Sequence, residues 1–203
     1  MINTDKFLQD LQKVRWHVAI NTFGSDHATL IGLLVDLWIS ENQETNWALE
    51  SGPSNGYSAV GTRGQCDALL CRGNVPVGIL EVEGSRKAET ARKIGTFFKA
   101  ENEEFKSLEF GILVLYSYEP SGKGDMRKFD EACPPEARDE VRKVSRKYSK
   151  KPIIVISIEK TFSRISEGIR STTEYYKGTP SVIAAECFTG GDVISKKEFY
   201  RAI

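Results

Sequence analysis

Histidine is scarce in this chain of 203 residues, which contains only His17 and His27. The cysteines are also few, form no CxxC pair and lie far from both histidines: Cys66, Cys71, Cys133 and Cys187. Zinc sites are usually built from closely spaced Cys and His ligands, so we do not expect one here. The two histidines likewise give no basis for a Ser/His/Asp or Cys/His catalytic arrangement.

The chain also lacks a surplus of charge, because 28 basic residues balance 28 acidic ones. Any charged partner must therefore be met by a local patch. The longest apolar stretch, residues 28 to 39, is too short to span a bilayer and contains Asp36. The opening MINTDKFLQDLQ does not resemble a secretory signal. We therefore expect a cytoplasmic protein with reduced thiols and no membrane contact.

The apolar content is 40%, which is enough for one sizeable core at this length. The pattern predicts a single α/β domain over residues 1 to 203, with a mixed central sheet flanked by helices. It divides into N-terminal helices at 3 to 50, a core at about 45 to 118, and a C-terminal helix, strands and tail at 119 to 203.

Apolar periodicity places the individual elements. Helices are expected at residues 3 to 19, from Ser25 or Asp26 to about Glu50, at 88 to 98, at 141 to 151 and, at the end of the chain, at 195 to 203. Strands are expected at residues 57 to 60, 65 to 71, 77 to 83, 110 to 118, 152 to 158 and 181 to 188.

Three carboxylates fall within apolar strands rather than in loops: Asp67 in QCDALL, and Glu81 and Glu83 in LEVEGS. Alternation along a strand puts Glu81 and Glu83 on one face, and a turn near Gly73 would bring Asp67 beside them. Such a cluster is costly without a cation, and its oxygen ligands suit Mg²⁺ or Mn²⁺. The alternative is that these charges occupy the solvent face of a half-buried hairpin.

With these residues the chain resembles the PD-(D/E)xK nuclease superfamily. The core of that superfamily is a helix, a strand meander carrying an Asp and then a Glu-x-Lys pair, a helix and a further strand. QCDALL, LEVEGS, SRKAETARKIGTFF and FGILVLYSY follow this order, and the match covers about residues 45 to 118. The resemblance implies a restriction-endonuclease-like fold.

Two positions depart from the family pattern. Cys66 stands where the motif has proline, and Glu83 stands where the family usually has its lysine. Some restriction endonucleases of the superfamily use Glu-x-Glu there. In other members the lysine has moved to the following helix, where Lys87 could serve in this chain.

The resemblance also implies roles for individual residues. Asp67 and Glu81 would hold the metal, and Glu83 would bind metal or orient the water that attacks a phosphodiester. Glu50 matches loosely an extra helical carboxylate of some members, with Glu44 as a competitor.

The expected function is a Mg²⁺-dependent endonuclease acting on double-stranded DNA, most closely a type II restriction endonuclease. A compact domain that cuts both strands would need a symmetric partner, so we expect a homodimer. Two alternatives remain open. One is an inactive nucleic-acid-binding protein of the same fold, and the other is a repair or junction-resolving nuclease.

A candidate DNA-binding surface comes from VRKVSRKYSKK, residues 141 to 151, which has six basic residues and no acid. At helical spacing these residues gather on one side and could contact a phosphate backbone. The alternative is a solvated helix whose charges are offset by Asp139, Glu140 and residues 101 to 109. The residues expected to contact DNA are Arg142, Lys143, Arg146, Lys147 and Lys150, together with Arg63 and Lys123 in glycine-bearing loops.

Overall fold

The computed structural model describes residues 3–11, 23–41, 47–49, 66–83, 89–99, 103–117, 135–160, 163–164, 176–177 and 180–198. The helices are α1 (Thr4–Asp10), α2 (Phe23–Glu41), α3 (Glu89–Lys99), α4 (Glu103–Lys106) and α5 (Pro135–Lys147). The strands are β1 (Trp47–Leu49), β2 (Ala68–Arg72), β3 (Val75–Glu83), β4 (Phe110–Ser117), β5 (Ile153–Lys160), β6 (Ser163–Arg164), β7 (Tyr176–Lys177), β8 (Pro180–Thr189) and β9 (Asp192–Glu198).

One mixed open sheet organises the described part of the chain, with the strand order β1-β2-β3-β4-β5-β8-β9. The central strands β3, β4 and β5 are parallel, and every other neighbouring pair in this sheet is antiparallel. The connections β3–α3–α4–β4 and β4–α5–β5 are crossovers, which parallel strands require. The prediction of an α/β fold with a mixed central sheet flanked by helices is confirmed.

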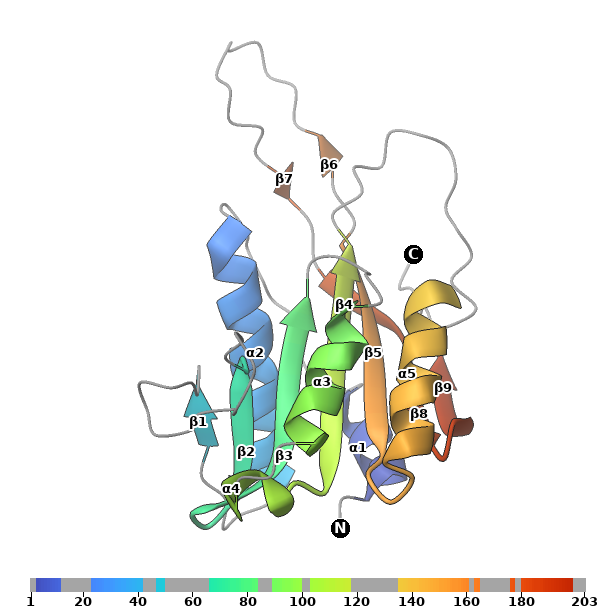
Figure 1. The fold of residues 1–203 in the computed structure, drawn as a ribbon. Helices are drawn as coiled ribbons and strands as arrows, with labels where there is room; N and C mark the ends of the chain where they lie inside the picture. Colours follow the sequence, from blue (N-terminus) through green and yellow to red (C-terminus); the bar gives the residue numbers. More distant parts are fainter. Residues whose placement is uncertain are drawn as a thin grey trace.

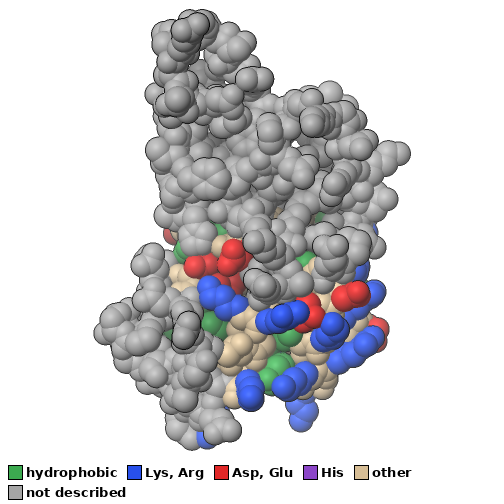
Figure 2. Space-filling model, turned by 45° about the horizontal axis from the view of Figure 1, so that its top comes forward, with side chains coloured by type: hydrophobic (Ala, Val, Ile, Leu, Met, Phe, Trp, Pro, Cys, Tyr) green, Lys and Arg blue, Asp and Glu red, His purple; other side chains and the backbone are tan. Residues whose placement is uncertain are grey.

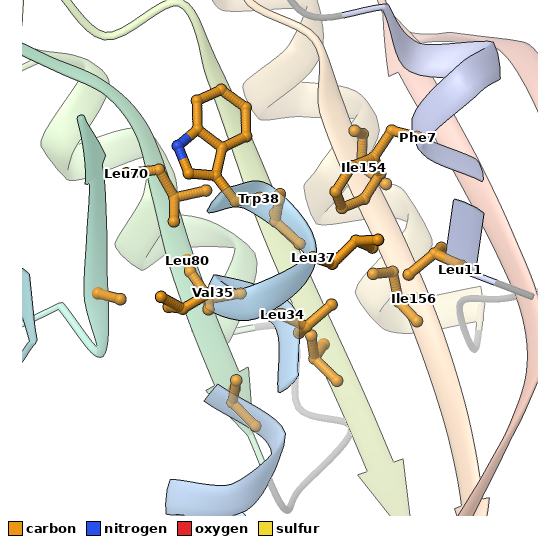
Figure 3. Packing of buried hydrophobic residues seen from close by; sticks show 14 of the residues in the cluster. Phe7, Leu11, Leu34, Val35, Leu37, Trp38, Leu70, Leu80, Ile154 and Ile156 are labelled. Atoms are coloured by element: carbon orange, nitrogen blue, oxygen red, sulfur yellow. The ribbon is translucent and has the colours of Figure 1, made fainter. Parts of the chain in front are cut away.

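Helices cover both faces of the sheet, as Figure 1 shows: α3 and α5 lie in front of the strands, and α1 and α2 lie behind them. The front layer carries many Lys and Arg side chains, which gather over α3 and α5 in Figure 2. Behind the sheet, Trp38 of α2 packs 5.3 Å from the Phe110 ring of β4, measured between ring centroids. Figure 3 shows the apolar layer to which Trp38 belongs.

Period-two alternation in β3 divides its side chains between the two layers. Leu80 and Val82 belong to the apolar cluster under α1 and α2, whereas Ile79 belongs to the cluster under α3 and α5. Glu81 and Glu83 therefore fall on the α3 face together with Ile79. This alternation places the buried Glu81 beneath a helix, with the partly exposed Glu83 on the same face.

Two glycines allow close packing around β3. Gly73 adopts a φ of 60°, which favours glycine, and it closes the β2–β3 hairpin. Gly78 contacts the ring of Phe110 so closely that a Cβ atom at this position would overlap it. The missing side chain lets the large ring lie directly on β3.

A second buried acid lies on the same face of the sheet, beneath α5. Glu186 of β8 accepts a hydrogen bond of 2.8 Å from Arg138 of α5, and the side chains are 1% and 10% exposed. The strand register aligns Glu81 with Leu113, Leu113 with Val155, and Val155 with Glu186. The two buried acids thus lie in one row of the sheet, each under its own helix.

Most predicted elements are confirmed where the chain is described, but two boundaries and one element type were wrong. The helix expected to reach Glu50 ends at Glu41, because residues 47–49 pair with β2 as an edge strand. The helix expected from residue 195 is instead the strand β9 up to Glu198, because this segment pairs with β8. The helix expected over 141 to 151 ends at Lys147.

Other predicted elements are only partly tested. The first helix is present as α1, and its predicted continuation over 12 to 19 lies outside the described residues, as does the strand predicted at 57 to 60. Within the described segments, no helix combines the length and hydropathy needed to cross a membrane.

Candidate active site

The β2–β3 hairpin carries all three acidic residues of the candidate site. Asp67 immediately precedes β2, and its Oδ2 accepts a hydrogen bond of 2.6 Å from the backbone N–H of Val82. Because Ala68 pairs with Leu80, Asp67 lies next to Glu81 in the hairpin. Asp67 and Glu83 both act electrostatically on Glu81, so the hairpin concentrates negative charge at one point.

Lys93 of α3 supplies positive charge to this cluster. Its Nζ donates a hydrogen bond of 2.5 Å to Oε2 of Glu81. The Glu81 side chain is fully buried, and that of Lys93 is 28% exposed. A charge-assisted bond of this kind partly offsets the cost of burying the acid. The site therefore contains a lysine, although it does not come from the strand.

Sequence reasoning missed Lys93, because the apolar stripe of this helix follows Ala88, Ala91, Gly95 and Phe98 at helical spacing, and Lys93 lies outside that stripe. A signal was nonetheless present. Lys93 precedes the buried Phe97 by four residues, and positions four apart lie on nearly the same side of a helix. A cation at the border of a buried stripe, above a strand that carries acids, is a good candidate for an ion pair.

The electrostatics of the pair show how strongly the site is desolvated. Burial is the largest cause that raises the pKa of Glu81, to about 8, and the charge of Asp67 adds to it. Lys93 offsets part of this increase. Desolvation lowers the pKa of Lys93, but the three neighbouring carboxylates outweigh it, so that this pKa is raised. Lys93 therefore acts as a fixed cation at neutral pH.

Cys66 lies beside the acids and shares their environment. Burial, followed by the charges of Glu81 and Asp67, raises the pKa of its thiol to about 12. A thiol that stays protonated is a poor nucleophile and a poor metal ligand. The chemistry of the site therefore depends on the carboxylates and Lys93.

The donors of the cluster fit a hard divalent cation. Oε1 of Glu81 is buried and has no hydrogen-bond partner among the described residues, although its carboxylate holds Lys93 through the other oxygen. Carboxylate oxygens are the ligands that Mg²⁺ and Mn²⁺ prefer. Across the described segments, no three His, Cys, Asp or Glu side chains are already arranged as a metal site. Asp67 and Glu81 would therefore have to reorient toward the metal from their contacts with Val82 and Lys93.

Several predicted site residues lie outside the described residues: Lys87, Glu50, its competitor Glu44, Arg63 and Lys123. Their roles stay predictions.

The predicted DNA-contacting residues of α5 do not all face the same way. Lys143 is exposed and donates a hydrogen bond of 2.8 Å to Glu140, on the side of α5 where Glu140 also contacts α3. Arg146 lies against Gly191 in the β8–β9 turn, on the other flank. Lys147 and Lys150 are exposed, and Lys150 follows the end of the helix. The basic segment therefore has two separate flanks.

Comparison with known proteins adds no assignment. No protein family model, curated protein or solved structure matches the chain significantly.

Proposed function

We propose that the protein is a metal-dependent endonuclease that hydrolyses phosphodiester bonds in double-stranded DNA. The observation that carries this proposal is the buried contact between Lys93 and Glu81, with Asp67 and Glu83 beside it. Three carboxylates and one lysine at the end of a β-hairpin are the components that the resemblance to PD-(D/E)xK nucleases calls for. The lysine that the strand lacks at Glu83 is provided by α3.

The order of elements supports a restriction-endonuclease-like fold. A hairpin carrying the acids is followed by a helix and then by a parallel strand, β4, that pairs with β3. This order and the lysine on the helix favour the Glu-x-Glu variant of that fold. Within this group, a type II restriction endonuclease acting as a homodimer stays our first choice.

Each residue has a distinct part in the proposed reaction. Asp67 and Glu81 would hold Mg²⁺ or Mn²⁺, and Glu83 would bind metal or orient the attacking water. Such a cation supplies Lewis acidity, which polarises the phosphate and makes water a better nucleophile. Lys93 stays protonated, so it would stabilise negative charge on the phosphate oxygens rather than accept a proton.

A cleavage assay tests the proposal directly. Long duplex DNA of mixed sequence is incubated with the wild type and with Asp67→Asn, Lys93→Met and Glu81→Gln, in Mg²⁺ and in EDTA. We expect discrete fragments from the wild type in Mg²⁺ only, and a loss of at least about 100-fold in each variant. Asp36→Asn, on the exposed side of α2, and Lys197→Met, on β9, are matched controls that should cleave normally.

One observation favours a second function, a nucleic-acid-binding protein that has lost cleavage. In the described segments Glu81 is engaged by Lys93 and Asp67 by the backbone, and no three such side chains are arranged around a metal position. Absence of cleavage with every divalent metal, together with intact DNA binding, would establish this function instead. A preference for branched over linear duplexes would identify a repair or junction-resolving nuclease.

A further inference from the structure

Two rows of cations lie side by side on the helical layer that covers the candidate site. Arg92 and Lys99 lie on nearly the same side of α3, two turns apart, and both are exposed. Lys143 and Lys147 form the corresponding row on α5, where they are one turn apart and also exposed. Lys151 follows the end of α5 and lies over the Phe98 ring of α3, 5.1 Å from its centroid.

Specific contacts hold the two rows together at both ends. Near the start of α3, Glu140 accepts hydrogen bonds from Arg92, at 3.2 Å from Nε, and from Lys143, at 2.8 Å. Near its end, the rings of Phe98 and Tyr148 pack edge to face, 5.6 Å apart. Between these contacts, Val144 fits against Gly95, where there is no side chain to separate the helices. The cations therefore belong to one continuous surface.

We propose that this surface binds the phosphate backbone of duplex DNA beside the carboxylate cluster. We call it the α3–α5 basic surface and define it by Arg92, Lys99, Lys143, Lys147 and Lys151. The proposal rests on the proposed function, because it assumes that nucleic acid is the substrate. It differs from the prediction from sequence in adding Arg92 and Lys99 of α3, and in leaving out the flank of α5 that carries Arg146.

The spacing of the cations suits a polyanion. Lys143 and Lys147 are separated by about 6 Å along the helix axis, which is comparable to the few ångströms between successive charges of a nucleic acid strand. Arg92 directly precedes Lys93, the α3 residue that contacts Glu81, so the surface and the candidate site share this helix. Contacts of this kind with the DNA phosphate backbone give affinity and fix the position of the protein along the duplex, but they do not give sequence specificity.

The same surface is poorly suited to a membrane. Proteins that bind at the bilayer surface combine basic residues with exposed apolar side chains that insert among the lipids. Among the described residues, the exposed large hydrophobics are Val75 and Ile194, which lie on β3 and β9 rather than on α3 or α5. A nucleic acid therefore fits the surface better than an anionic lipid does.

Glu140 makes the proposal testable in both directions. Its carboxylate contacts two of the five cations, so Glu140→Gln removes a negative charge that offsets both cations and would repel phosphate. We expect Glu140→Gln to bind DNA a few-fold more tightly, whereas Lys99→Gln/Lys147→Gln should bind about tenfold more weakly. Tighter binding could not result from a damaged fold.

The experiment measures binding of a labelled 20-base-pair duplex by fluorescence anisotropy in EDTA, so that no cleavage can occur. With five phosphate contacts, log K should fall with log salt concentration at a slope of about −4.5, and the double variant should lower the magnitude of that slope by about 2. Lys196→Gln/Lys197→Gln on β9 removes two lysines elsewhere and should bind like the wild type. Anionic vesicles serve as the membrane control.

The outcomes separate this inference from the proposed function. If the wild type cleaves DNA while both α3–α5 variants bind DNA as the wild type does, the proposed binding surface is wrong and the proposed nuclease activity is right. If DNA binding changes as expected but no DNA is cleaved, the proposed binding surface is right and the proposed nuclease activity is wrong. Binding to vesicles but not to DNA would overturn both.

Discussion

Replacing Glu81 by Gln should make the metal-free protein more stable. Burial raises the pKa of Glu81 to about 8 from an ordinary value of 4.5. Between these values the folded protein keeps a proton that the unfolded chain has released, so the free energy of unfolding falls as pH rises. Each pH unit costs about 1.4 kcal/mol, and the two and a half units from 4.5 to pH 7 cost about 3 kcal/mol. Gln keeps the shape of the protonated acid and escapes this cost.

Thermal unfolding in EDTA at several pH values measures the effect. At pH 7 the melting temperature of Glu81→Gln should exceed that of the wild type by about 6 to 12 °C, given about 2 to 4 °C per kcal/mol at this chain length. The advantage should shrink toward pH 4.5 and disappear below it. Equal stability of the two proteins at pH 7, with the same pH dependence, would refute burial of Glu81 as the cause.

Glu140→Gln provides a matched control, because the charge of Glu140 is expected to stabilise the folded protein rather than destabilise it. Hydrogen bonds from Lys143 and then Arg92 lower the pKa of Glu140, so its charge stabilises the folded protein above the ordinary pKa and that benefit is lost as pH falls. The same substitution should therefore stabilise the protein at position 81 and not at position 140. A residue whose removal improves stability but abolishes the proposed cleavage would be retained for function rather than for folding.

Three further predictions concern the layer above the sheet and the strand beneath it. Arg138→Met should lower the free energy of unfolding, measured by urea titration, by about 3 to 5 kcal/mol, because it leaves Glu186 buried without its cation. The double variant that also carries Glu186→Gln should recover most of this lost stability. Gly78→Ala should cost about 1 to 3 kcal/mol in the same assay through overlap with Phe110, and Phe110→Leu in the same chain should relieve part of it. Cys66 should resist iodoacetamide at pH 8 in the folded protein and react in urea, because burial raises the pKa of its thiol to about 12. Mass spectrometry identifies the labelled cysteines, and rapid labelling of Cys66 under native conditions would contradict the raised pKa.

The sheet could be predicted from sequence because its strands carry strong local patterns. The nearly continuous apolar runs of β4 and β5 are typical of strands covered on both faces, and Gly73 marks the turn of the β2–β3 hairpin. Period-two alternation alone placed Glu81 and Glu83 on one face. Each of these signals lies within a short stretch of sequence, which is why the sequence alone was sufficient to predict these features of the sheet.

The remaining features depend on contacts between distant segments. Residues 47–49 become a strand because β2 provides hydrogen-bond partners, and nothing in WAL itself requires it. The contact of Lys93 with Glu81 depends on how α3 is rotated above the sheet. Periodicity identifies a helix and its apolar stripe, but a residue at the border of the stripe can turn inward or outward depending on what lies beneath.

The row of the sheet that contains Glu81 and Glu186 limits how its covering helices can move. Each helix holds one buried acid through one cation, Lys93 from α3 and Arg138 from α5. A slide of either helix by a single residue, about 1.5 Å, would stretch a short hydrogen bond to an acid that is buried. The helical layer is thus held in register with the strands at two points. A bound molecule would therefore meet a layer whose two helices keep their positions on the sheet.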